Sequence, residues 1–149
     1  MPNANDTTPY AAFGLRIALG LVLLAHGALL KLATVGLAGT MGYFASIGYP
    51  PSLGALVALG ETAAGLALLS GVLVRTASLL SLPIVLGATL QHSGNGWVFT
   101  APGGGWEFPA FLAAALLVQA GLGAGAWPLR SVSRDGPEAF GSRRPGAGE

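Results

Sequence analysis

The sequence predicts an all-α integral membrane protein, folded as a four-helix bundle. Of its 149 residues, 52% are hydrophobic and only 9% are charged, whereas a soluble domain carries about 25% charged residues. Four apolar runs have about the length of 20 residues that a membrane-spanning helix needs. None of these runs alternates apolar and polar residues as barrel strands do. Length and composition therefore favour one helical membrane domain.

The breaks between the apolar runs define the expected elements. The Gly48-Tyr49-Pro50-Pro51 segment precedes the second run, Gly71 follows it, and the glycine-rich stretch 93–107 precedes the fourth. We expect a further short helix at the outer surface over 40–47. The expected spans are 13–32, 52–73, 76–90 and 108–128. The membrane domain thus covers 13–128, between an N-terminal segment 1–12 and a tail 129–149 that we expect to be disordered.

The basic residues predict the orientation of the bundle. With four spans, Arg16, Arg75 and the four arginines between 130 and 144 share one side, and Lys31 is alone on the other. Because cytoplasmic segments are enriched in Lys and Arg, we expect both termini in the cytoplasm.

Three residue pairs indicate an internal repeat of two helical hairpins. Pro51 and Pro109 each open a helix and lie 58 residues apart (109 − 51), and the same shift places Glu61 on Gln119. Arg16 and Arg75 lie 59 residues apart (75 − 16), and each begins a helix on the inner side. Parallel repeats of this kind occur in membrane transporters. The sequence also permits the alternative that this match is coincidental.

Composition excludes several classes of function. The chain has no cysteine, so thiol redox chemistry, disulfides and Cys-ligated clusters are ruled out. A formal net charge of +1 gives no basic field for nucleic acid. The two histidines lie at unequal depths, so we expect no metal site and no intrinsic cofactor. The expected surroundings are the lipid bilayer.

Glu61 and His26 are the candidate catalytic residues. Glu61 lies near the centre of the second span, where a charged carboxylate costs at least about 2.5 kcal/mol. His26 lies at a similar depth in the first span and titrates near neutral pH. A Glu–His pair is therefore a candidate proton relay. The alternative is a hydrogen bond between helices that only fixes their packing.

The other candidate site residues gather toward the same outer end of the bundle. We assign them to substrate binding: Lys31, Gln91, His92 and Glu107. The alternative is that they are ordinary interfacial polar residues, with the Lys31 side chain extending to the membrane surface.

Several segments in combination resemble one family of membrane proteins. They are Arg16, Leu24-Ala25-His26-Gly27, Lys31-Leu32, Gly48-Tyr49-Pro50, Gly60-Glu61 with Gly65, Gly71 with Arg75, Asn95-Gly96-Trp97 and Gly105-Trp106-Glu107. These residues resemble the DoxX family. The resemblance implies a four-helix inner-membrane protein with both termini inside. It also implies association with membrane oxidoreductases that use quinone, with His26, Lys31, Glu61 and Arg75 as the matching positions.

Three functions remain open from the sequence. The preferred hypothesis is a membrane subunit of a quinone-linked oxidoreductase, with quinone as a substrate and a partner subunit that supplies electrons. The first alternative is a non-catalytic scaffold or anchor for a redox complex. The second is a small transporter, because a carboxylate in mid-membrane is typical of such proteins. A homo-oligomer is compatible with all three.

Overall fold

The computed structural model describes residues 6–129, and these residues are helical without any β-strand. The predicted all-α class is confirmed. The elements are α1 (Thr8–Leu24), the π-helix η1 (Ala25–Thr34), α2 (Leu37–Ser46), α3 (Pro51–Ser70), α4 (Val74–His92), the short 3-10 helix η2 (Ser93–Asn95) and α5 (Glu107–Leu122). The tail and the four arginines from 130 onward, which entered the predicted orientation, lie outside the described residues.

Three continuous helical segments are long and apolar enough to cross a membrane. They are Thr8–Thr34, Pro51–Ser70 and Val74–Asn95, with 27, 20 and 22 residues. The fourth helix, α5, has 16 residues and ends at Leu122, not at residue 128 as predicted. Gly123 ends it, because its φ of +80° is a conformation that favours glycine. At 1.5 Å per residue α5 is about 24 Å long.

The first helix begins earlier than predicted, at Thr8 and not at residue 13. The Asp6 side chain accepts a hydrogen bond from the Thr8 backbone N–H at 3.0 Å, and Pro9 occupies the first turn, where its missing N–H costs nothing. These two local signals start the helix in a polar stretch that apolar run length alone does not include.

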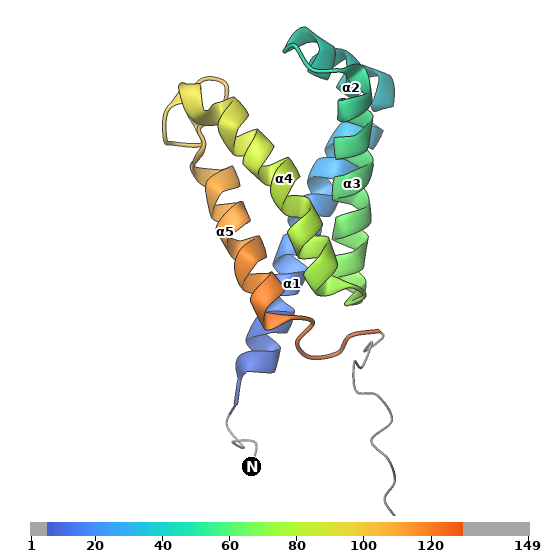
Figure 1. Ribbon diagram of the computed structural model, residues 1–149, viewed down its shortest axis with the longest axis vertical. Helices are drawn as coiled ribbons and strands as arrows, with labels where there is room; N and C mark the ends of the chain where they lie inside the picture. Colours follow the sequence, from blue (N-terminus) through green and yellow to red (C-terminus); the bar gives the residue numbers. More distant parts are fainter. Residues whose placement is uncertain (1–5, 130–149) are drawn as a thin grey trace, which may run out of the picture.

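The helices form two hairpins that diverge like the arms of a V (Figure 1). One arm holds α1, η1 and α3, with α2 packed on α3; the other holds α4 and α5. The arms meet at the end where the chain turns from α3 into α4. The structure has two helical hairpins, as predicted. That the two hairpins form an internal repeat stays a prediction. Glu61 and Gln119 are both buried as that repeat requires, but Arg16 is buried and Arg75 is exposed.

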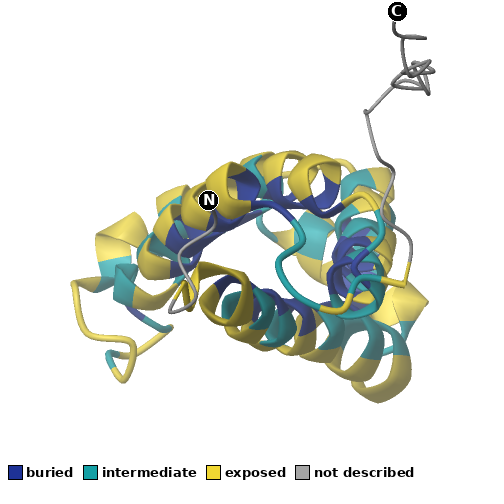
Figure 2. Ribbon diagram, turned by 90° about the horizontal axis from the view of Figure 1, so that it is seen from below, coloured by how far each residue is buried: buried dark blue, intermediate teal, exposed yellow. Residues whose placement is uncertain are grey.

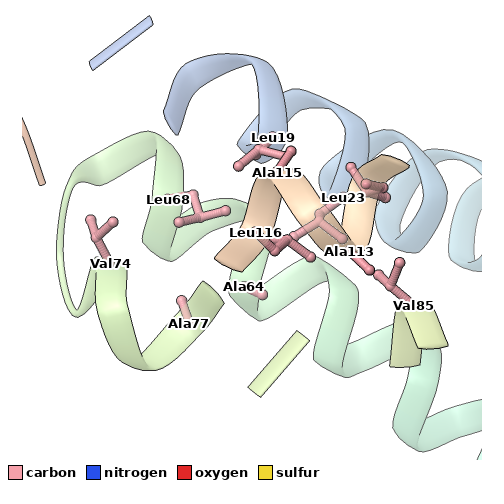
Figure 3. Packing of buried hydrophobic residues seen from close by; sticks show 11 residues of the cluster. Leu19, Leu23, Ala64, Leu68, Val74, Ala77, Val85, Ala113, Ala115 and Leu116 are labelled. Atoms are coloured by element: carbon pink, nitrogen blue, oxygen red, sulfur yellow. The ribbon is translucent and has the colours of Figure 1, made fainter. Parts of the chain in front are cut away.

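The apolar core lies where the two arms meet. Figure 2 shows that the buried faces of the helices point toward the interior, with exposed faces outward. In Figure 3, Leu19 and Leu23 of α1 lie against Ala115 and Leu116 of α5. Leu116 is completely buried. Outward apolar side chains are expected here, because lipid and not water surrounds the spans.

Small residues bring α1 and η1 very close to α3. A Cβ atom added at Gly65 would lie 2.8 Å from the backbone nitrogen of Leu24, and one at Gly27 would lie 2.6 Å from that of Thr62. Helices in membranes associate largely through such close van der Waals packing. The first arm therefore depends on glycine at these two positions.

After α5 the chain crosses the base of the bundle as residues 123–129, which we call the strap. The backbone N–H of Ala126 donates to the Pro9 carbonyl at 2.9 Å, and that of Leu129 donates to the Ser70 carbonyl at 3.0 Å. The strap therefore lies beside the start of α1, so both ends of the described chain are on one face of the molecule. A chain that crosses a membrane an even number of times must have both of its ends on one side.

The close contact of α1 and η1 with α3 at Gly27 and Gly65, which we call the glycine seam, gives a direct test of the packing in the first arm. We expect Gly65→Ala to lower the free energy of unfolding by about 1–3 kcal/mol, because the added methyl forces α1 and α3 apart. Gly14→Ala is the matched control, since Gly14 lies on α1, the helix that packs on α3, and a Cβ there meets nothing within 4 Å. Unfolding titrations of the purified protein measure both. Equal stability of the two variants would contradict the seam.

Candidate functional site

A cavity of about 690 Å³ is lined by residues of both arms, from the parts of the helices farther from the α3–α4 turn. Pockets that hold small organic ligands have volumes of about 300–1,000 Å³. Its walls are mostly apolar and aromatic, and every helical arm contributes to them. Five of the six predicted site residues line it: His26, Lys31, Glu61, Gln91 and His92.

The main polar feature of the cavity is an ion pair between η1 and α3. Lys31 Nζ donates to Glu61 Oε2 at 2.6 Å, and the two side chains are 19% and 10% exposed. The structure thus gives Glu61 a different partner from the expected His26. The Lys31 side chain therefore points to Glu61 and not outward, as the alternative required. Within the apolar wall its ammonium group neutralises the charge of Glu61.

His26 lies in the same cavity but meets an aromatic ring instead of a carboxylate. Its imidazole stacks on the Phe108 ring of α5, with a centroid distance of 6.2 Å and an interplanar angle of 22°. His26 therefore bridges the two arms across the cavity. The three groups with proton-exchange chemistry, His26, Lys31 and Glu61, all face one chamber.

The π-helix η1 explains why His26 and Lys31 share this chamber. In α-helical geometry, residues five apart point about 140° away from each other at 3.6 residues per turn. The i→i+5 bonding of a π-helix stacks such residues, and π segments are frequent at functional sites. The bond from the Val35 N–H to the Leu30 carbonyl, at 2.9 Å, has this spacing. The wider winding thus aligns both side chains on one face.

The end of η1 is held by two hydroxyl groups. The Thr34 hydroxyl donates to the Leu29 carbonyl at 2.8 Å, five residues earlier. The buried Thr40 hydroxyl of α2 donates to the Lys31 carbonyl at 2.9 Å. The helix α2 therefore fixes the backbone of the residue whose ammonium group bonds Glu61. Its observed range, Leu37–Ser46, confirms the short helix expected near 40–47.

His92 lines the cavity and also supports the loop that follows α4. Its Nδ1 lies 3.0 and 3.1 Å from the carbonyl oxygens of Gly103 and Gly104. Asn95 Nδ2 donates to the same two oxygens at 2.9 and 3.0 Å. The left-handed φ values of Gly103 and Gly104, +81° and +79°, make this turn possible. These hydrogen bonds thus hold the loop in place as part of the cavity wall.

Glu107 does not line the cavity with the other predicted substrate-binding residues. Its Oε1 accepts a hydrogen bond from the Phe99 backbone N–H at 2.9 Å, so it ties down the same loop. It lines a separate depression beside Trp97 and Phe111 and not the cavity. Gln91 is exposed and lines the cavity.

The aromatic part of the cavity wall was not predicted from the sequence. Its rings come from three separate segments: Tyr43, Phe44, Tyr49, Phe99 and Phe108. The sequence signal that could have indicated them was the aromatic content of 43–49, which we assigned to a surface helix over 40–47 and the break that follows it. Within residues 6–129, no cluster of three or more His, Asp or Glu residues has the geometry to hold a metal ion.

This fold and this site define a helical membrane protein with an apolar chamber and a buried ion pair. The DoxX family model matches residues 11–102, which is more than half of the chain, and the chain belongs to the DoxX family. The match covers the first arm from residue 11 onward, α4 and most of the loop that follows it. No curated protein and no solved structure matches this chain.

The ion pair predicts a specific pattern of stability. Removing one partner of a buried pair leaves an uncompensated charge and costs about 3–5 kcal/mol, whereas replacing both is often nearly neutral. We therefore expect Lys31→Met to destabilise the protein strongly. The double variant Lys31→Met/Glu61→Gln should recover most of that loss.

Unfolding titrations of the unmodified protein, of Lys31→Met and Glu61→Gln, and of the double variant measure this coupling. Additive losses from Lys31→Met and Glu61→Gln would mean that the two side chains do not interact.

Proposed function

We propose that this DoxX family protein is the membrane subunit of a quinone-linked oxidoreductase, and that its cavity binds the quinone head group. The observation that carries the proposal is the Lys31–Glu61 pair in the wall of an otherwise apolar chamber. A ligand for such a chamber is lipid-soluble and has a few polar atoms at one end. Quinones have this character.

The shape and lining of the cavity suit a flat ring with a long apolar tail. The His26 and Phe108 rings, nearly parallel at 22°, offer flat surfaces on which a ring can stack. Leu56 of α3 lines the cavity and is 66% exposed, so this wall continues onto the lipid-facing surface. A tail would leave toward the bilayer along α3.

The polar wall provides groups that bond and protonate a carbonyl oxygen. The Lys31 ammonium has three N–H donors, one of which bonds Glu61, so two remain for a ligand oxygen. Reduction of a quinone to a quinol takes up electrons and an equal number of protons. In this proposal a partner subunit supplies the electrons, and the Glu61 carboxylate and the His26 imidazole each take up a proton from solvent and then donate it to a quinone oxygen.

The proposed orientation follows from charge. The face with the strap carries Arg75, and cytoplasmic segments of membrane proteins are enriched in such residues. We therefore propose that this face is cytoplasmic, in the inner membrane, and that the arms diverge toward the outside. The protons for the quinone would then enter from the outer side.

The role of Glu61 is tested by Glu61→Gln, which keeps the shape of the side chain and removes its exchangeable charge. We expect quinone-dependent electron transfer in membranes to fall by about 100-fold or more, as for loss of a general acid. Thr62→Val is the matched control, because the Thr62 hydroxyl bonds the Ala58 carbonyl of its own helix and does not line the cavity.

Protein levels in the membrane must be equal in both variants. Undiminished electron transfer in Glu61→Gln would refute the proton-transfer role. If the variant changes only the assembly of the complex, the chain is a scaffold.

A further inference from the structure

The closed end of the bundle contains three buried polar side chains that the proposed quinone site does not use. Arg16 of α1 is 1% exposed, and Ser78 of α4 and Gln119 of α5 are completely buried. Within residues 6–129, four buried side-chain atoms have no hydrogen-bond partner, and all belong to these residues: Arg16 Nε and Nη1, Ser78 Oγ and Gln119 Oε1.

Helical register places the three side chains at one level. Leu23, Val85 and Leu112 all line the floor of the cavity. Each lies seven residues, or about two helical turns, from one of the polar residues on the same helix. Seven residues return to the same helix face. Arg16, Ser78 and Gln119 therefore form a polar layer about 10 Å beyond the cavity floor, at 1.5 Å per residue.

An apolar layer separates this polar layer from the cavity. Leu19, Leu68 and Leu116 belong to the buried core (Figure 3). All three are at most 3% exposed. In sequence, Leu19 lies between Arg16 and Leu23 on α1, and Leu116 lies between Leu112 and Gln119 on α5. The polar layer is thus closed off from the cavity and faces the strap.

The strap covers the polar layer and bonds to it directly. Arg16 Nη2 donates to the carbonyl oxygens of Ala126 and Trp127, both at 3.4 Å. Gln119 Nε2 donates to the Gly123 carbonyl at 2.7 Å. A Cβ at Gly71 would collide with Arg16 Nη1, so the guanidinium also fills the space beside the α3–α4 turn.

The covered arrangement carries several energetic penalties. The four unpartnered atoms have no contact with water, and a buried polar group without a partner is destabilising. Among residues 6–129 the guanidinium forms no ion pair, since the pair found there joins Lys31 and Glu61. Trp127 has a φ of +49°, which a residue with a side chain rarely adopts.

Besides the side-chain hydrogen bonds from Arg16 and Gln119, few contacts hold the strap closed. They are two backbone hydrogen bonds, to Pro9 and Ser70, and the packing of the Trp127 ring on Tyr10 and Phe13 at centroid distances of 5.4 and 5.0 Å. The Trp127 ring is itself 68% exposed. Opening the strap would break these contacts, relax Trp127 and let water reach the four unpartnered atoms.

We propose that the strap is a gate that opens and closes the end of the bundle opposite the cavity. In the open state, water from that face hydrates Arg16, Ser78 and Gln119, while the apolar layer keeps this water out of the cavity. The proposal is independent of the quinone hypothesis, because it concerns a different set of residues. It gives the bundle two separate points of access, one at each end.

Thiol accessibility tests the gate, because the sequence has no cysteine and a single introduced thiol is therefore unique. Ser78→Cys changes one oxygen to sulfur in the polar layer. Ser81→Cys is the matched control, since Ser81 is 1% exposed and lies one turn nearer the cavity, within the apolar layer. Both variants are treated with a negatively charged methanethiosulfonate reagent in detergent, after size-exclusion chromatography shows that they are folded.

We expect Ser78→Cys to react at least about tenfold faster than Ser81→Cys, since transient opening exposes only the first. Adding Trp127→Ala should accelerate the Ser78→Cys reaction by a further factor of about five, because it weakens the closed state. The Ser81→Cys rate should not change. Equal rates for the two thiols, with no effect of Trp127→Ala, would overturn the gate and leave the strap a static seal.

Hydrogen exchange on the unmodified chain gives a second readout that no cysteine variant can disturb. We expect the amides of Ala126 and Leu129, both hydrogen-bonded, to exchange at least about 100-fold faster than those of Leu116 and Gln119 in α5. Exchange of the strap amides as slow as that of the core would also overturn the proposal.

Discussion

The site depends on one constraint, which is that a carboxylate in the middle of a membrane span needs a compensating charge. Lys31, which follows His26 by five residues, provides this charge, with its Nζ 2.6 Å from Glu61 Oε2. This pairing requires η1 to wind as a π-helix, so that both side chains face the cavity. It also requires α1 and η1 to lie close against α3, which the glycines at 27 and 65 permit. Helix winding, helix packing and chemistry are therefore linked in the first arm.

The two ends of the bundle are packed differently. At one end small residues and leucines close the arms on each other, and the strap covers a layer of buried polar groups. At the other end, aromatic rings and a loop held by His92 and Asn95 keep a chamber open. The chamber and the polar layer under the strap are therefore separate parts of the bundle, one at each end.

The sequence predicted the apolar runs, the breaks between them and the importance of Glu61, because hydropathy and buried charge are local properties. It did not predict the end of α5 at Leu122, which a single glycine conformation decides. Nor did it predict the π-helix, which has no signature in the residues of 25–34, and so it paired Glu61 with His26. Arg16 was expected to be an interfacial charge, yet it is buried; its burial depends on the strap, a contact between residues more than 100 positions apart.

Photoaffinity labelling with an azido-quinone tests the central claim that the cavity beside Lys31 and Glu61 binds a quinone. Peptide mass spectrometry of the labelled protein identifies the modified residues. The account predicts labels on cavity-lining residues of both arms, such as Val57 of α3 and Ala88 of α4, and their loss when excess unmodified quinone competes. Labels spread over lipid-facing residues outside the cavity, such as Leu117 of α5, and insensitive to competition would contradict it.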